Sequence, residues 1–285
     1  MNWNSYYINR IIDNWLDEDL GSGDLTVSGI SKEIGKAYWI SKEDGIFCGA
    51  ELIKKIYERI DPKIKLDLLI NDGEKFTKHQ RILELTGSPK SLLAGERTSL
   101  NIAMHLSGIS SYTAKLVDKL KNTNIKLADT RKTTPGLRIL EKYAFKCGGG
   151  INHRMGLFDA AMVKENHIAW SENLDKVVRK IRENSPFTTH IIIEAENINQ
   201  AREAILAGAD SILLDEIEPD LLRTSIENLR NLSRKQSKKN NISIEVSGIN
   251  PNEIDKYFID GINLISTSSA TTKSNWIDFS MRYIS

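Results

Sequence analysis

The 285-residue chain is nearly neutral, with 39 Lys and Arg against 38 Asp and Glu and a formal charge of +1. This balance argues against a nucleic-acid-binding surface, which usually makes the whole chain basic. Its two cysteines, Cys48 and Cys147, have neither a metal-binding spacing nor a disulfide framework, so we expect a reducing compartment. No secretory signal is visible, and no run approaches the roughly 18 apolar residues that span a bilayer. The composition therefore predicts a soluble cytoplasmic protein with one large or two moderate domains.

The first part of the chain mixes helical and strand-like patterns. Residues 3–16 carry Trp, Tyr and Ile at helical spacing and predict an amphipathic opening helix. Strand-like runs at 36–40 and 64–70 flank a helical piece at 51–60. These patterns predict an α+β domain of roughly 100 residues. Residues 91–120 then follow a helical pattern.

Short apolar runs alternate with amphipathic segments in the second part of the chain. The runs span 125–131, 160–166, 191–196, 211–216, 242–248 and 263–269, and the helix-like segments lie near 137–146, 171–184, 197–207, 219–235 and 251–259. This alternation predicts parallel strands joined by crossover helices. No early strand–GxGxxG–helix pattern is present, which weakens the case for a dinucleotide-binding open sheet. The charged run at 234–241 is typical of a solvated helix end and loop.

A polar side chain ends every one of these runs. The residues are Arg131, Lys164, Glu194, Asp215, Ser247 and Ser268. Enzymes built on α/β barrels place their active sites at the C-terminal ends of the strands. Because only six runs are clear, the pattern predicts an α/β barrel with fewer than eight strands.

Positive charge is concentrated between residues 130 and 167. This segment holds seven Lys or Arg (Arg131, Lys132, Arg138, Lys142, Lys146, Arg154 and Lys164) against three acids. A local excess of cations in a neutral protein indicates a focused site for a small anion. The turns TTPG (133–136) and CGGG (147–150) would let backbone N–H groups approach such a ligand.

The same segment carries a family resemblance. TRKTTPG and KYAFKCGGGINHRMGLFDAAMVKENH closely resemble the core signature of quinolinate phosphoribosyltransferases, which are pentosyltransferases of NAD biosynthesis. Further matches are EDLGSGDLT near the start, GERTSLN, LSGIS and AREAILAGADSILLD, so the resemblance spans nearly the whole chain. It implies an N-terminal α+β sandwich domain (1–110) followed by an incomplete α/β barrel of parallel strands (111–271), with 272–285 packing back on the first domain.

The resemblance also implies the reaction. The phosphoribosyl group of phosphoribosyl pyrophosphate would pass to quinolinate with decarboxylation, giving nicotinate mononucleotide, pyrophosphate and CO2. Two alternatives are a related phosphoribosyltransferase that acts on another heteroaromatic acid, such as the molybdenum-operon paralogue, and a non-catalytic paralogue that binds phosphoribosyl pyrophosphate. The resemblance favours the decarboxylating transferase, since KYAFKCGGGINHRMGLFD follows that version closely.

Site residues follow from the resemblance position by position. Those around the quinolinate carboxylates would be Arg131, His153, Arg154 and Lys164, with Arg97 completing the site of the neighbouring subunit in a homodimer. A planar guanidinium can hold a carboxylate through two parallel hydrogen bonds, which suits this substrate. Lys132 would face the phosphoribosyl and pyrophosphate groups. Glu194 and Asp215 would hold the ribose hydroxyls and Mg²⁺, the metal through water, and stabilise positive charge at C1′. The implied catalytic set is Lys132, Lys164, Glu194 and Asp215.

The C-terminal phosphate-binding end departs from the family pattern. Ser247 and Gly248 are followed directly by Ile249, where relatives usually have a second glycine. Ser268 replaces a usual glycine, Thr272 a usual histidine and Glu216 a usual asparagine. Serine hydroxyls can still donate to phosphate, so the expected phosphate ligands are Ser247, Gly248, Ser268 and Ser269. We expect phosphoribosyl binding to be retained with altered affinity.

Overall fold

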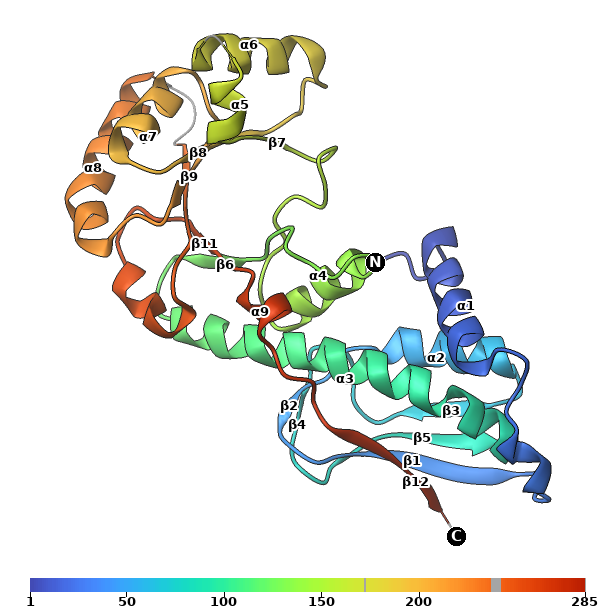
Figure 1. Ribbon diagram of the computed structural model, residues 1–285. Helices are drawn as coiled ribbons and strands as arrows, with labels where there is room; N and C mark the ends of the chain where they lie inside the picture. The colour runs from blue at the N-terminus through green and yellow to red at the C-terminus, as the bar shows by residue number, and fades with distance from the viewer. Residues whose placement is uncertain (172, 237–241, 285) are drawn as a thin grey trace. The chain divides into compact units, whose positions relative to one another are not determined.

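The computed structural model describes residues 1–171, 173–236 and 242–284, which form two compact units (Figure 1). Unit 1 contains Met1–Ala114, Leu140–Gly149 and Lys273–Ser285, and unit 2 contains Lys115–Ile139 and Gly150–Thr272. Of the charged run predicted at 234–241, residues 237–241 lie outside the described residues. No helix within the described ranges is both long and apolar enough to cross a membrane.

Unit 1 is built on a four-stranded antiparallel sheet in the order β12-β1-β5-β3. Its strands are β1 (Gly35–Ser41), β3 (Lys65–Leu68), β5 (Arg81–Gly87) and β12 (Phe279–Ile284), with β2 (Gly45–Ile46) and β4 (Lys75–Phe76) forming a small second sheet. Its helices are α1 (Tyr6–Leu20), a 3₁₀ helix (Thr26–Gly29), α2 (Ala50–Ile60), most of α4 (Arg138–Cys147) and the first part of α3 (Pro89–Leu120). The core combines aliphatic side chains with aromatic ones, including Trp39, Phe47, Phe76 and Phe279.

Local signals explain where these elements begin and end. Helix α1 starts at Tyr6 and not at residue 3, because Ser5 is the N-cap and its side chain accepts a hydrogen bond from Ile8 N. The helix then buries Ile8, Ile12 and Leu16 on one face. Helix α3 is one continuous helix of 32 residues, in agreement with the helical pattern over residues 91–120. Gly108 permits close packing within it, since a Cβ there would lie 2.2 Å from the carbonyl oxygen of Asn275.

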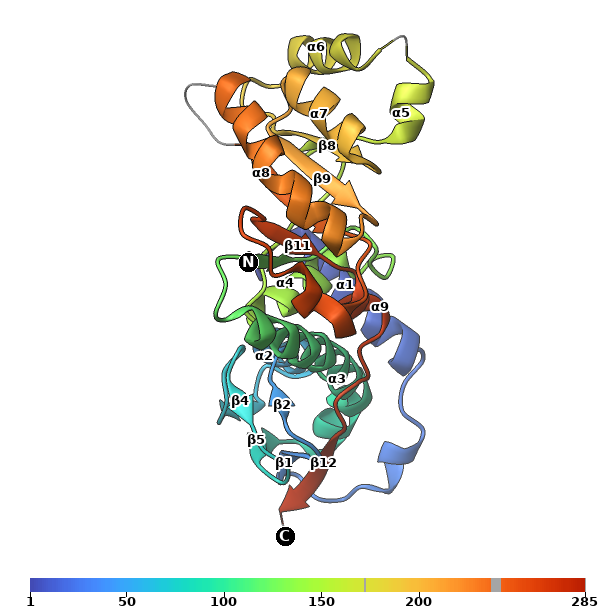
Figure 2. The same cartoon turned by 90° about the vertical axis from the view of Figure 1, so that its left-hand side faces the viewer.

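Unit 2 contains six parallel strands in the order β6-β11-β10-β9-β8-β7, which confirms the predicted incomplete barrel. The strands are β6 (Lys126–Ala128), β7 (Ala161–Val163), β8 (Ile191–Ala195), β9 (Ser211–Asp215), β10 (Ser243–Ser247) and β11 (Leu264–Ser266). The helical segments are α5 (Glu165–Ala169), α6 (Leu174–Asn184), α7 (Ile198–Leu206), α8 (Pro219–Gln236), a 3₁₀ helix (Pro251–Tyr257) and α9 (Ser269–Thr272). Figures 1 and 2 show α7 and α8 on the same outer side of β8 and β9.

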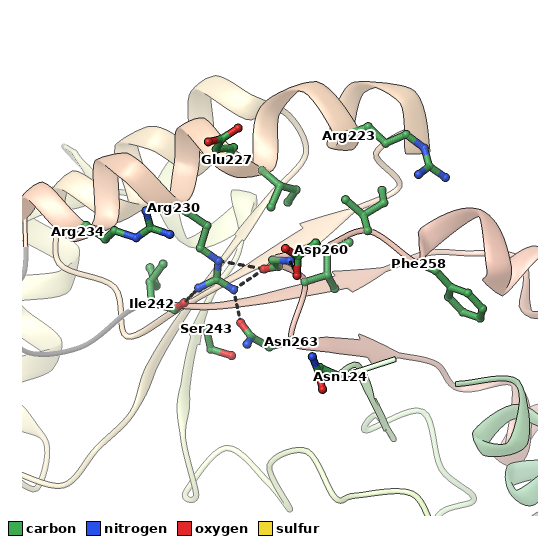
Figure 3. A pocket seen from close by; sticks show the side chains of 14 residues that line it. Asn124, Arg223, Glu227, Arg230, Arg234, Ile242, Ser243, Phe258, Asp260 and Asn263 are labelled. Carbon is green, nitrogen blue, oxygen red and sulfur yellow. Dashed lines mark hydrogen bonds between the residues drawn. The ribbon is translucent and has the colours of Figure 1, made fainter. Parts of the chain in front are cut away.

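The N-terminal ends of the central strands are held by one arginine (Figure 3). Arg230 of α8 donates through Nε to the carbonyl of Gly261 at 3.0 Å, and its other nitrogens donate to Gly261, Ile242 and the Asn263 side chain. These contacts join α8 to the starts of β10 and β11. A cavity of about 970 Å³ lies beside them. Because protein oxygens engage each of its guanidinium nitrogens, we assign Arg230 a structural role.

Candidate active site

A second cavity, of about 280 Å³, lies at the C-terminal ends of the strands and entirely within unit 2. It is lined by Asp129, Thr130, Arg131, Lys132, His153, Arg154, Met162, Lys164, Glu194, Leu213, Asp215, Glu245, Ser247 and Ser266. Its volume lies near the lower end of the range for small-molecule sites, which suits a compact ligand. Parallel barrels bind their substrates at this end.

Strand register explains which side chains reach the cavity. Glu194 of β8 is paired with Leu213 of β9, which is paired in turn with Glu245 of β10. Two residues further on, Asp215 is paired with Ser247. Because side chains alternate between the two faces of a strand, these five residues share the inner face of the sheet.

Asp129 positions the cationic loops. Its carboxylate is 1% exposed and accepts hydrogen bonds from the Asn152 side chain at 2.7 Å and from His153 N at 2.8 Å. Ile151 forms a parallel bridge with Ala128, which extends the sheet beside β6. The segment after the CGGG turn is thereby held next to the loop that begins at Asp129. Our sequence interpretation gave Asp129 no role, although it directly follows the apolar residues of a predicted strand.

Two guanidinium groups meet in this cavity. Arg131 and Arg154 both line it, and Nε of Arg131 is buried with no hydrogen-bond partner among the described residues. Arg154 donates to the carbonyl of Ala160 at 2.9 Å. The pKa of Arg154 is lowered, mainly by burial and next by the charge of Arg131, while Glu194 acts in the opposite direction. Neighbouring cations with an unsatisfied donor are well suited to an anionic ligand, which would relieve their repulsion.

Lys164 and Glu194 form an ion pair in the cavity. Nζ of Lys164 lies 2.5 Å from Oε2 of Glu194 and joins the ends of β7 and β8. The Lys164 side chain is 44% exposed, whereas that of Glu194 is 13% exposed. The carboxylate is therefore held against the sheet while the ammonium keeps access to a ligand.

His153 is oriented by a second buried carboxylate. Its Nδ1 accepts a hydrogen bond from Arg154 N at 2.7 Å, so the ring proton is assigned to Nε2, which lies 3.2 Å from Oε2 of Glu245. Glu245 is 3% exposed, and its Oε1 is buried with no partner among the described residues. Glu245 was not among the predicted site residues. Its position two residues before Ser247, on the same strand face, was the available signal.

Family models match both parts of the chain. The model described as "Quinolinate phosphoribosyl transferase, N-terminal domain" matches residues 19–107, and the model of the C-terminal domain matches residues 109–282. The chain belongs to the quinolinate phosphoribosyltransferase family. The family predicted from the TRKTTPG and CGGGINHRMGLFD motifs is thus confirmed.

Individual relatives agree over nearly the full length. The chain is 39% identical to the probable nicotinate-nucleotide pyrophosphorylase [carboxylating] of Bacillus subtilis, over 98% of this chain and 94% of the relative. It is 36% identical to the protein of the same name from Synechocystis, over 96% and 91%. The crystal structure of NadC from Streptococcus pyogenes superposes with a TM-score of 0.91, covers 100% of both chains and is 34% identical.

The turns after β9 and β10 contain backbone strain. Gly248 has φ 74°, and a Cβ there would lie 2.4 Å from Cγ and 2.9 Å from the backbone N of Glu216. Glu216 itself has φ 54°, an uncommon value for a residue other than glycine, and its N donates to the carbonyl of Ser247 at 3.1 Å. The turns after β9 and β10 therefore fit together only with glycine at position 248.

The remaining predicted site residues lie outside the cavity lining. Ser268 lies between β11 and α9, and Ser269 begins α9, where Thr267 Oγ1 donates to Ser269 Oγ at 2.9 Å. Helix α9 is joined to the cationic loop, because Thr271 Oγ1 donates to the carbonyl of Lys132 at 2.8 Å. Arg97 lies on an exposed face of α3 in unit 1. The cavity thus brings together eight predicted residues, namely Arg131, Lys132, His153, Arg154, Lys164, Glu194, Asp215 and Ser247.

Proposed function

We propose that this enzyme transfers the phosphoribosyl group of phosphoribosyl pyrophosphate to quinolinate with decarboxylation, forming nicotinate mononucleotide for NAD biosynthesis. One observation carries the proposal. Arg131, Arg154 and Lys164 line the same cavity as the carboxylates of Glu194 and Asp215. A dianionic ring needs the cationic side chains, and a reaction centre that develops positive charge needs the carboxylates. The shared name of the bacterial relatives supports the same activity.

The cationic residues bind and orient quinolinate. Arg131 and Arg154 hold its adjacent carboxylates, since a guanidinium matches the planar geometry of a carboxylate. The unpaired buried Nε of Arg131 then gains an acceptor. Lys164 contributes a further positive charge from the neighbouring strand. This arrangement directs the pyridine nitrogen toward the ribose.

Transfer begins when the lone pair of the pyridine nitrogen attacks C1′ and the bond from C1′ to the pyrophosphate oxygen breaks. Positive charge develops at C1′, where Glu194 and Asp215 stabilise it. One well-placed group of this kind contributes about 3 kcal/mol. The bond between C2 and its carboxylate then breaks, CO2 leaves, the cationic ring holds the electron pair, and a proton takes the vacated position at C2.

The phosphate groups and Mg²⁺ would be held by the remaining residues of the proposed site. Lys132, Ser247, Gly248, Ser268 and Ser269 are the phosphate ligands in this proposal. Glu194 and Asp215 offer carboxylate oxygens on neighbouring strands, which are the hard ligands that Mg²⁺ prefers, directly or through water. Bound Mg²⁺ would neutralise charge on the departing pyrophosphate.

We further propose a cytoplasmic homodimer in which Arg97 completes the neighbouring subunit's quinolinate site. Arg97→Ala and Lys164→Ala homodimers should then both be inactive. A mixed dimer contains one site that carries neither substitution, so about half of the wild-type activity should return. Differently tagged subunits allow verified heterodimers to be purified and assayed. Heterodimers that stay inactive would refute the shared site without touching the proposed reaction.

The reaction itself is tested by CO2 release that depends on both quinolinate and phosphoribosyl pyrophosphate. Isotopically labelled quinolinate identifies the CO2, and NMR identifies nicotinate mononucleotide. Nicotinate is the matched control substrate because it lacks the 2-carboxylate. Turnover of another heteroaromatic acid but not of quinolinate would favour the related transferase. Binding of phosphoribosyl pyrophosphate without turnover of any acid would favour a non-catalytic paralogue.

A further inference from the structure

Unit 1 contains a separate group of potential metal ligands outside the cavity described above. The sulfur atoms of Cys48 and Cys147 and a carboxylate oxygen of Asp72 all lie within 4.8 Å of one another. Within the described ranges, no other group of three His, Cys, Asp or Glu side chains meets this spacing. The family's reaction uses none of these residues in the mechanism proposed above.

Each ligand is fixed by its own part of unit 1. Cys48 lies between β2 and α2 and is fully buried, and its backbone N donates to Ser107 Oγ at 3.0 Å. Cys147 is the last residue of α4 and is partly exposed, which gives an ion a route of entry. Asp72 belongs to the turn before β4, and this turn is anchored by a hydrogen bond from Gly73 N to Phe47 O at 2.8 Å. The three positions are far apart in the sequence but preorganised in the fold.

The hydrogen bonds of Asp72 orient its carboxylate. Oδ1 accepts from Gly49 N at 2.8 Å and from Ala50 N at 2.9 Å, while Oδ2 accepts from Tyr143 OH at 2.8 Å. Carboxylates that bind metals are themselves hydrogen-bonded, and these outer partners fix their direction. A carboxylate oxygen has two lone pairs, so Oδ2 can bind an ion and keep Tyr143.

We propose that Cys48, Cys147 and Asp72 bind one divalent cation that prefers thiolate ligands, with Zn²⁺ as the probe of choice. A tetrahedral zinc site with Zn–S of about 2.3 Å places its sulfur atoms about 3.8 Å apart, inside the observed spacing. Two thiolates exclude Mg²⁺ as the preferred ion, because hard cations select oxygen. Water supplies the fourth ligand, and Tyr143 remains an outer partner that donates to Asp72.

The ion would link three segments of unit 1 that are far apart in the sequence. It would tie the end of α4 to the turn before α2, immediately ahead of the glycines at 148–150. The three anionic ligands exceed the charge of the ion by one. A disulfide is the competing chemistry for the same two sulfur atoms, but it needs them at about 2.05 Å and gives Asp72 no role.

Metal titration of the full-length protein tests this proposal. Protein kept reduced with a phosphine is stripped by a chelator and titrated with Co²⁺. We expect one equivalent per chain, a thiolate-to-cobalt charge-transfer band, loss of that band when Zn²⁺ is added, and a higher unfolding temperature with Zn²⁺. Asp72→Asn and Cys147→Ser should abolish the band. Asp67→Asn, an exposed carboxylate of the same unit, is the matched control and should keep it.

Two further measurements guard against variants that fold poorly. Tyr143→Phe keeps every ligand and should weaken Zn²⁺ binding about tenfold, as loss of an outer-shell partner does. In unmodified protein, Zn²⁺ should slow the reaction of both thiols with an aromatic disulfide reagent. Absence of the charge-transfer band in the unmodified protein would overturn the proposal. So would an intact band in folded Cys147→Ser, or a Cys48–Cys147 disulfide formed in place of metal uptake.

Discussion

Lys164 Nζ and Glu194 Oε2 lie 2.5 Å apart, and this pair joins the C-terminal ends of β7 and β8 inside the cavity. The pair fixes the carboxylate of Glu194, which stabilises the positive charge that develops at C1′ in the proposed reaction. Glu194→Gln should therefore lower kcat by about 10²- to 10³-fold, because the amide is neutral when the transition state needs charge. Steady-state kinetics at saturating substrates measures the loss.

Glu196→Gln is the matched control for this charge change. Glu196 lies two residues later in the chain and is exposed. Its substitution should leave kcat within a factor of about two, as expected for a surface position. Equal losses in the two variants would show that bulk charge and not the position of Glu194 controls the rate.

Glu245 should act as a positioning residue through His153. Glu245→Ala removes the acceptor of the His153 ring proton, so we expect KM for quinolinate to rise about tenfold or more, in line with loss of a hydrogen bond to a charged group. Glu245→Gln keeps an acceptor oxygen and should recover most of the affinity. KM for phosphoribosyl pyrophosphate should stay unchanged in both variants.

A purely structural role for Glu245 makes a different prediction. It would lower the free energy of unfolding, measured by urea denaturation, and leave the two KM values in their original ratio. That pattern would reject the positioning role and leave Glu245 as part of the buried framework of β10.

The parts of this site that depend on strand periodicity could be predicted from the sequence. Arg131, Lys164, Glu194, Asp215 and Ser247 all end apolar runs, and parallel strands bring such ends to one edge of a sheet. Side chains earlier in a strand depend on register as well. Glu245 joins the cavity only because it pairs with Leu213 beside Glu194. A single sequence gives no register between strands that are far apart in the chain.

Packing explains features that local propensity does not predict. Glycine lowers helix propensity by about 1 kcal/mol, yet Gly108 lies inside the continuous helix α3. Its effect is outweighed by the close approach of Asn275, which only a residue without Cβ allows. The helix-like segment near 251–259 contains a 3₁₀ helix, and its sequence pattern did not distinguish this form from an α-helix. Neither outcome can be predicted from local propensity alone, since both depend on tertiary context.

Glu216→Asn should stabilise the enzyme. Glu216 has φ 54°, and Asn adopts this left-handed conformation more readily than Glu does. We expect the free energy of unfolding to rise by about 1 kcal/mol. The substitution also removes a negative charge beside Gly248, which is a phosphate ligand in the proposed reaction, so affinity for phosphoribosyl pyrophosphate should increase, as calorimetric titration would show.

Glu216→Gln separates these two effects. Gln removes the charge but has no preference for the left-handed region, so it should raise affinity for phosphoribosyl pyrophosphate without the gain in unfolding free energy. Equal stability in the Asn and Gln variants would mean that backbone strain at position 216 is absent in solution.

Gly248→Ala should specifically weaken the binding of phosphoribosyl pyrophosphate at the proposed phosphate site. The new Cβ would meet Glu216 at 2.4 Å and 2.9 Å on a backbone with φ 74°, so the turns after β9 and β10 must separate. We expect a loss of about 1–3 kcal/mol in unfolding free energy and a raised KM for phosphoribosyl pyrophosphate. Gly261→Ala provides the matched control, because it has φ 92° and a Cβ contact of 2.6 Å with Ile226, beside the Arg230 network at the other end of the strands. It should show a similar loss of stability with an unchanged KM. If both variants raised KM equally, general destabilisation would explain the effect, and Gly248 would have no particular part in binding phosphate.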